Sequence, residues 1–165
     1  MNVARLCRHV FTTRWSTRAH FPRGVRDAIE KAIGDCEHRH GGEIRFVVET
    51  AFDVPELWRN LAPRTRALQI FGQFGVWDTA HNNGVLIYVL IADHDVEIVA
   101  DRGIAQHISA AEWATVCRQM EAHYKAGRFR EGSIAGVEGV GALLGRHFPG
   151  RRHSDNELPN QPVLL

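Results

Sequence analysis

A polar segment at residues 77–84 (WDTAHNNG) carries side chains that could bind a metal cation. Asp78, Asn82 and Asn83 offer carboxylate and amide oxygens, which are the ligands that Ca²⁺ and Mg²⁺ prefer. The same residues also suit a turn, because Asn-Gly favours tight turns and Asn tolerates left-handed backbone geometry. Spacing alone therefore leaves a cation site and an ordinary turn as alternatives.

A second polar group follows at residues 101–103 (DRG), after a predicted strand over residues 95–100. That strand should form a hairpin with the apolar run before it, turning at residues 93–94. Counting outward from the turn places Asn83 and Asp101 level at one end of the sheet, so the two polar loops should face each other. The simpler alternative is that Asp101 only caps nearby backbone N–H groups.

Signals for other catalytic chemistry are weak. No serine lies in a GxSxG motif, and no P-loop is present. Cys36 and Cys117 fall on apolar helical stripes and are interpreted as core thiols. The glycines of residues 139–145 (GVGALLG) lie within a helical pattern, which favours close helix packing over a dinucleotide site. His81 lies in the first polar loop, either as an acid, base or phosphate contact or simply as an exposed loop residue.

The elements that must position these loops follow from hydrophobic periodicity. Residues 84–92 (GVLIYVLIA) form a continuous apolar run, which is typical of a strand covered on both faces. Ser109 and Glu112 form a capping box, which predicts the start of a helix. The predicted helices run over residues 23–40, from Pro63 to Gly75, from the Ser109 cap to Gly127 and over 130–147, and the predicted strands cover residues 43–49, 84–92 and 95–100.

This order predicts an α/β fold in which a small mixed β-sheet is covered by helices on both faces, a three-layer α-β-α arrangement. The strand–helix–strand unit favours a parallel pair with a right-handed crossover, and the hairpin adds an antiparallel strand. One domain is expected over residues 23–148. A basic N-terminal arm or helix over residues 1–22 precedes it, and a disordered tail over residues 149–165 follows it.

Composition limits the functional classes. The chain has 165 residues, enough for one domain, and its formal net charge of +1 argues against a nucleic-acid partner. No apolar run approaches the ~20 residues of a transmembrane segment. Three widely spaced cysteines and the lack of an apolar leader predict a reduced, cytoplasmic protein. Residues 1–26 contain six Arg and no acid, so residues 1–22 are expected either to pack on the domain or to make a peripheral membrane contact.

Two segments together resemble the TPM domain family. They are residues 40–49 (HGGEIRFVVE) and residues 77–104 (WDTAHNNGVLIYVLIADHDVEIVADRGI). The family includes thylakoid-lumen photosystem-repair proteins and many bacterial proteins, and the resemblance covers about residues 23–148. It implies a small sheet between helices and a pocket for a divalent cation, commonly Ca²⁺, at one end of that sheet. Acid-phosphatase activity has been attributed to the plant members.

The resemblance also implies which residues form the site. Asn83 and Gly84 match the family pattern, and Asn82 stands where the pattern often shows an acid before NGVL. Asp78 and Asp101 are the acids that could complete a pocket for Ca²⁺ or Mg²⁺. A neutral amide in place of a carboxylate should weaken the affinity for the cation.

Two functions follow as hypotheses. The first is a binding or accessory module that presents a surface to a membrane-associated protein or complex, with a divalent cation holding its loops. The alternative is a metal-dependent phosphatase that hydrolyses phosphate monoesters. In that alternative Asp78 and Asp101 would be metal ligands, or one of them a base, and Arg102 would stabilise the charge of the phosphate.

Overall fold

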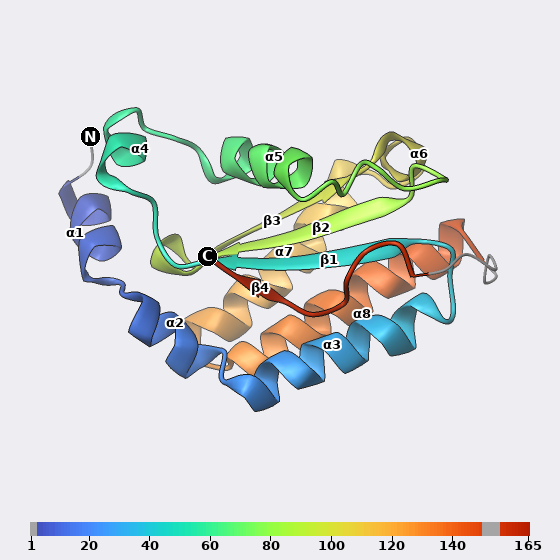
Figure 1. Ribbon diagram of the computed structural model, residues 1–165, viewed down its shortest axis with the longest axis horizontal. Coiled ribbons are helices and arrows are strands. Elements are labelled where there is room, and N and C mark those ends of the chain that lie inside the picture. Colours follow the sequence, from blue (N-terminus) through green and yellow to red (C-terminus); the bar gives the residue numbers. More distant parts are fainter. Residues whose placement is uncertain (1–2, 150–155) are drawn as a thin grey trace.

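The computed structural model describes residues 3–149 and 156–165, which form helices and strands arranged in layers (Figure 1). Along the chain the elements are α1 (Val3–Phe11), α2 (Arg14–His20), α3 (Arg23–Glu37), β1 (Glu43–Glu49), α4 (Val54–Trp58), α5 (Pro63–Gln73), β2 (Gly84–Leu90), η1 (Ile91–Asp93), β3 (Asp95–Ala100), α6 (Arg102–Ala105), α7 (Ala110–Lys125), α8 (Phe129–His147) and β4 (Val163–Leu164). No helix within these described ranges has the length and apolar character needed to cross a membrane.

The sheet has the strand order β3-β2-β1-β4. β1 and β2 run parallel from the Glu43–Gly84 pair to the Glu49–Leu90 pair, so α4 and α5 form the crossover between them. β2 and β3 form the predicted antiparallel hairpin, in which Val85 pairs with Ala100. The 3₁₀ turn η1 closes the hairpin, ending at His94 with a positive φ of 53°. The predicted parallel pair and hairpin are both confirmed.

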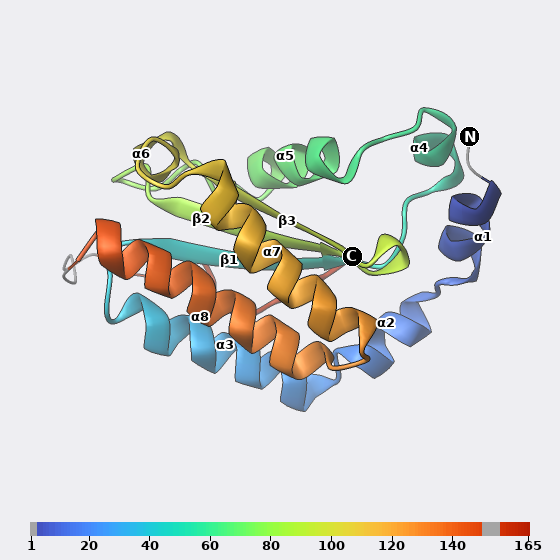
Figure 2. The ribbon, with the colours of Figure 1, turned by 180° about the vertical axis from the view of Figure 1, so that it is seen from behind.

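The two faces of the sheet carry separate apolar cores, because side chains alternate between faces along a strand. Phe46 and Ile87 belong to the larger core, which is shared with α3, α7 and α8. Val47 and Tyr88 belong to the smaller core on the other face, which is shared with α4 and α5. Figure 2 shows this division, with α5 on one side of the strands and α3, α7 and α8 on the other. The three-layer prediction is confirmed.

The C-terminal segment corrects one prediction. A disordered tail was expected over residues 149–165, but residues 156–165 lie along the edge of the sheet, where β4 pairs parallel with β1. Leu158 is buried in the smaller core, and the N–H of Leu165 donates to the carbonyl of Val48 at 2.8 Å. The polar composition of this segment gave no signal for its few buried apolar residues, which pack beside a strand edge that would otherwise be open. Residues 150–155 lie outside the described residues.

The N-terminal arm consists of α1 and α2, joined to the domain by α3 (Figure 1). α1 contacts η1 at the turn of the hairpin. α2 is held to the end of β1 by a hydrogen bond between the hydroxyls of Thr17 and Thr50, which are 3.0 Å apart. The arm therefore lies at the carboxyl end of the parallel strands, away from the polar loops.

Candidate functional site

The two polar loops meet at the amino ends of β1 and β2. The N–H of Asp101 donates to the carbonyl of Gly84 at 2.9 Å, which continues the hairpin by one residue. The Arg102 Nε donates to the Asn82 Oδ1 at 3.0 Å, which ties the side chains of the two loops together. The expectation that these loops face each other is confirmed, and strand register is its cause.

Glycine is required in both loops because their backbones approach closely. A Cβ on Gly84 would lie 1.9 Å from the carbonyl oxygen of Val76, and a Cβ on Gly103 would lie 2.5 Å from that of Asn82. Contacts this short exclude any side chain at either position. Gly84 is therefore needed for the segment from Val76 to fold back on β2, and Gly103 is needed for the second loop to pack against the first.

Asn83 is locked in place by its neighbours. Its side chain donates from Nδ2 to the carbonyl of Gly41, and its backbone N–H donates to the Thr79 Oγ1 at 3.0 Å. Its own carbonyl accepts from the N–H of Glu43 at 3.0 Å, just where β1 starts. The residue is 5% exposed, and its Oδ1 has no hydrogen-bond partner among the described residues.

Asp101 divides its two carboxylate oxygens between two environments. Its Oδ1 accepts from the N–H of Arg102 at 2.6 Å, so it caps α6 as the simpler alternative expected. Its Oδ2 is buried and has no hydrogen-bond partner in the described part of the chain, and the residue is 8% exposed. Capping thus accounts for one oxygen and leaves the other without a hydrogen-bond partner among the described residues.

Two buried oxygens without partners form the chemical core of the site. A buried acceptor that lacks a partner costs about 1–3 kcal/mol, so such atoms usually bind water or an ion. A hollow of about 240 Å³ opens beside Asn83, with Gly41, His81, Gly103, His147, Phe148 and Pro149 as its other lining residues. The hollow supplies space beside Asn83, whereas Asp101 is not among the residues that line it. Carboxylate and amide oxygens are the ligands that a hard cation such as Ca²⁺ or Mg²⁺ prefers.

The remaining predicted residues are placed differently. Asp78 is exposed, and no hydrogen bond or ion pair joins its side chain to the loops within residues 3–149 and 156–165. Asn82 adopts a left-handed backbone, with φ of 52°, and its Oδ1 is occupied by the exposed Arg102. Across the described residues there is no group of three or more His, Cys, Asp or Glu that could hold a metal ion. Asn83 and Asp101 are thus the buried members of the predicted set.

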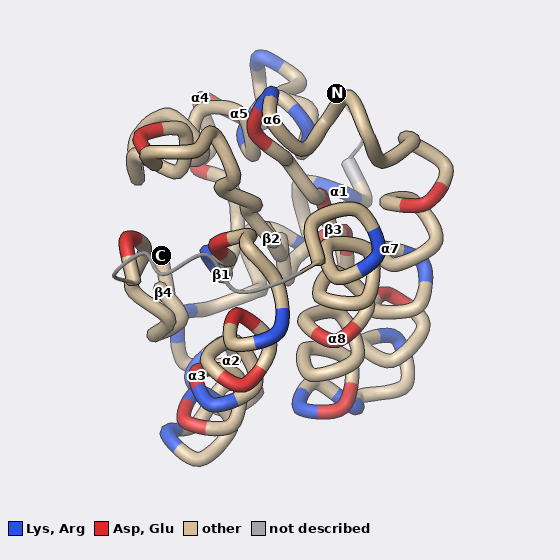
Figure 3. The backbone as a smooth tube through the Cα atoms, turned by 90° about the vertical axis from the view of Figure 1, so that its right-hand side faces the viewer, with Lys and Arg blue, Asp and Glu red and all other residues tan. Residues whose placement is uncertain are grey.

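Charge around this end of the molecule is mixed. Figure 3, which looks at the end bearing α6, shows acidic and basic residues interspersed along the helices. Among the described residues in this view, the charged positions do not gather into a patch of one sign, such as binding to a phosphate-rich polymer would require. Any attraction for a cation at this end must therefore come from local groups.

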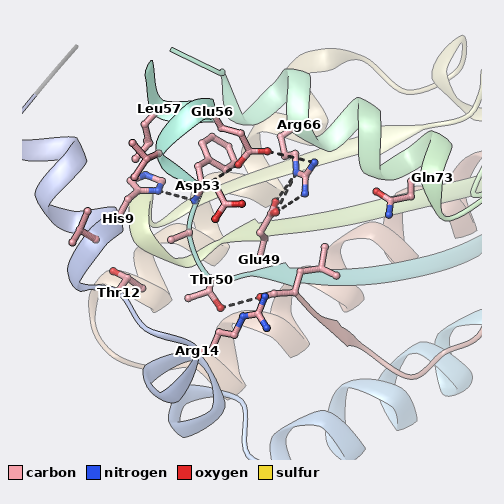
Figure 4. A pocket seen from close by; sticks show the side chains of 15 residues that line it. His9, Thr12, Arg14, Glu49, Thr50, Asp53, Glu56, Leu57, Arg66 and Gln73 are labelled. Atoms are coloured by element: carbon pink, nitrogen blue, oxygen red, sulfur yellow. Dashed lines mark hydrogen bonds and ion pairs between the residues drawn. The ribbon is translucent and has the colours of Figure 1, made fainter. Parts of the chain in front are cut away.

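A second polar cluster, which sequence reasoning missed, lies at the opposite end of the strands (Figure 4). A hollow of about 500 Å³ has Glu49 and Arg66 in its wall, and Arg66 binds both carboxylate oxygens of Glu49, at 2.6 and 2.9 Å. Burial, with the neighbouring Glu49, raises the pKa of Tyr88, whose hydroxyl donates to that carboxylate. The sequence signal that could have revealed this cluster was the presence of polar Glu49 and Tyr88 within otherwise apolar strands. Because Glu49 and Arg66 neutralise each other, this buried ion pair is interpreted as structural.

Cys36 and His40 form a buried pair that is unsuited to nucleophilic catalysis. The N–H of Gly42 donates to the His40 Nδ1 at 3.1 Å, so the proton of the neutral ring is on Nε2, 3.3 Å from the Cys36 Sγ. Burial and nearby Arg39 lower the pKa of His40 to about 4, and burial raises the pKa of Cys36. The imidazole is neutral and donates to the thiol, which therefore stays protonated.

Fold and site together define a small three-layer α/β domain with a polar hollow at the amino ends of its parallel strands. The family model described as the TPM domain matches residues 19–143. The chain therefore belongs to the TPM domain family, as the two sequence segments had indicated.

Two solved structures are similar to this chain. The BA42 protein from the psychrophilic bacterium Bizionia argentinensis, solved by NMR, is 31% identical, with a TM-score of 0.75 over 86% of this chain and 93% of that one. The N-terminal domain of a protein from P. gingivalis, also solved by NMR, is 16% identical, with a TM-score of 0.64 over 81% and 82% of the two chains. The second likeness concerns the fold alone. No curated protein matches the chain.

Proposed function

We propose that this TPM domain is a binding or accessory module whose polar loops are held by a divalent cation, Ca²⁺ or Mg²⁺. The observation that supports the proposal is the pair of buried oxygens, Asn83 Oδ1 and Asp101 Oδ2, neither of which has a partner among the described residues. A cation there would join the loop before β2 to the loop after β3. A membrane-associated protein or complex is the partner class that this module would serve.

The ligand set predicts weak binding. Asp101 brings one full negative charge and Asn83 a neutral oxygen, whereas Ca²⁺ takes six to eight oxygens, so water or backbone carbonyls must supply the rest. Sites with so little charge bind Ca²⁺ with dissociation constants of about 10⁻⁴–10⁻³ M. Asp78 and Asn82 remain sequence predictions as ligands, because one is exposed and the other already accepts from Arg102.

Thermal unfolding tests the cation directly, because a ligand that binds only the folded state stabilises it by RT ln(1 + [L]/Kd). At about ten times Kd, CaCl₂ or MgCl₂ should raise Tm by about 3–6 °C over an EDTA-treated sample. Asp101→Asn should abolish the rise, since its amide keeps a capping oxygen but loses the charge. Asp27→Asn, at an exposed carboxylate of α3 outside both loops, is the matched control and should retain it. An unchanged Tm at saturating cation would overturn the proposal.

The phosphatase alternative rests on Arg102, whose guanidinium is exposed and lies beside the same loops. A bound cation would polarise a phosphoryl oxygen there, and Arg102 would contact the phosphate. Asp78 or Asp101 would then be the candidate base. Hydrolysis of an aryl phosphate that needs added cation and is lost in Asp101→Asn would favour this alternative. Cation binding without turnover of the phosphate ester would favour the accessory module over the phosphatase.

A further inference from the structure

Helix α1 buries His9 and packs Leu6 partly against the smaller core, yet it leaves several apolar side chains exposed to solvent. His9 is 3% exposed, whereas Val10 is 58% and Phe11 80% exposed, and Cys7 is exposed on the same side. An amphipathic helix on a globular domain usually does the reverse. The described part of the chain offers no cover for this apolar side.

Buried polar contacts hold α1 in this orientation. Arg5 Nε lies 2.8 Å from one oxygen of Asp93, and His9 Nε2 lies 3.2 Å from the other. The His9 Nδ1 also accepts from the backbone N–H of Phe52 at 2.9 Å. Turning the helix to bury Phe11 would break all of these contacts and leave Asp93 unpaired, so the exposed apolar side is a fixed feature.

Helix α2 extends this surface. Trp15 is 84% exposed, and Arg14 and Arg18 are exposed beside it. No carboxylate pairs with either arginine among the residues that the structure describes. We call Val10, Phe11 and Trp15, with the two arginines, the arm face. It combines large apolar side chains with charge of one sign.

We infer that the arm face docks on an anionic phospholipid surface. A Trp and a Phe between arginines are the combination that interfacial helices use, with rings among the acyl chains and guanidinium groups at the lipid phosphates. Arg14 and Arg18 have no carboxylate partner among the described residues, unlike Arg5, which pairs with Asp93. Their two charges are therefore available to complement an anionic leaflet. A second copy of this chain would bring the same positive charge, so self-association through this face is disfavoured.

Docking in this way leaves the cation site accessible. Figure 1 places α1 and α2 at one end of the strands and α6, beside the polar loops, at the other. The inference goes beyond the proposed function and does not depend on it, because no residue of the arm face belongs to the cation site. The two can therefore fail separately.

Vesicle flotation of the full chain tests this inference. In EDTA, the protein should float with vesicles of equal parts phosphatidylcholine and phosphatidylglycerol, but not with phosphatidylcholine alone or in high salt. Replacing both rings, Phe11→Ala with Trp15→Ala, should weaken binding by about tenfold or more. Arg14→Gln with Arg18→Gln should also weaken it. Trp77→Ala is the matched control, since Trp77 is 55% exposed near the polar loops, and it should bind like the unmodified protein.

Three outcomes would overturn the inference. The first is equal binding to neutral and anionic vesicles, and the second is binding that the arm variants leave unchanged. The third is a concentration-dependent dimer that disappears in the Phe11 and Trp15 variant without any vesicle binding, which would mean that a second copy covers the face. Flotation that requires CaCl₂ and is lost in Asp101→Asn would assign membrane contact to the cation site instead.

Discussion

Asn83 and Asp101 each use one side-chain atom to hold the loops together and leave one oxygen buried without a partner. That division explains why a turn and a cation site were both consistent with the sequence. The fixed orientation of Asn83 comes from its donation to the Gly41 carbonyl, so its Oδ1 cannot turn away without losing that bond. Because hydrogen bonds already fix both side chains, the proposed cation binding would not have to order them first.

The Glu37 carboxyl gives a pH-dependent prediction. Burial raises the pKa of Glu37 to about 8, and the negative charge of nearby Glu43 contributes to this rise. The hydrogen bond from the N–H of Ile44 acts in the opposite direction and lowers the pKa. The folded state then holds a proton that the unfolded chain has released, so the free energy of unfolding should fall as pH rises through this interval. The slope should be at most about 1 kcal/mol per pH unit and should flatten as pH approaches 8, where half of the folded molecules have lost the proton.

Glu37→Gln checks this assignment, because the amide oxygen still accepts from Ile44 but cannot titrate. Urea unfolding at several pH values should show a flatter dependence for the variant than for the unmodified protein. His40, whose pKa is lowered, is mostly neutral in both states only above about pH 7.5, so the comparison with the variant separates the contribution of Glu37 from that of His40. Identical slopes for the two proteins would show that Glu37 titrates normally.

Among the elements, the strands of the domain were predictable and the tail was not. β1 (Glu43–Glu49) covers the predicted range, because its apolar residues alternate clearly and Gly41-Gly42 precedes it. β4 has only two residues and follows a polar segment, so no periodicity marks it. The outward apolar side of α1 was equally hidden, since its cause is the distant Asp93. Long-range partners, absent from local patterns, account for both failures.

The tail predicts a specific loss of stability. Leu158 is 5% exposed and belongs to the smaller core, although its segment reads as polar. Leu158→Ala should lower the free energy of unfolding by about 2–5 kcal/mol, through lost burial and a residual cavity. Leu68→Ala is the matched control, because Leu68 is 51% exposed, and it should change stability by no more than about 0.5 kcal/mol. Equal, small effects in chemical unfolding would mean that residues 156–165 do not pack in solution.

At the scale of the whole molecule, the sheet separates two surfaces of different chemistry. The polar loops lie at the amino ends of β1 and β2, and the arm face lies at the end where the hairpin turns (Figure 1). Register could be counted from the sequence to within one residue, so the meeting of the two polar loops was predictable, with Asp101 opposite Gly84 rather than Asn83. The exposure of Asp78 was not predictable, because it depends on how the loop folds between Val76 and Gly84.

A titration of CaCl₂ followed by amide NMR of the full chain tests the central claim most directly, since it reports each residue separately. The account predicts saturable shifts concentrated at residues 79–84 and 101–103, with midpoints of about 10⁻⁴–10⁻³ M, and their loss in Asp101→Asn. Absence of shifts at these residues, or shifts confined to the other end of the strands near Glu49, would contradict it.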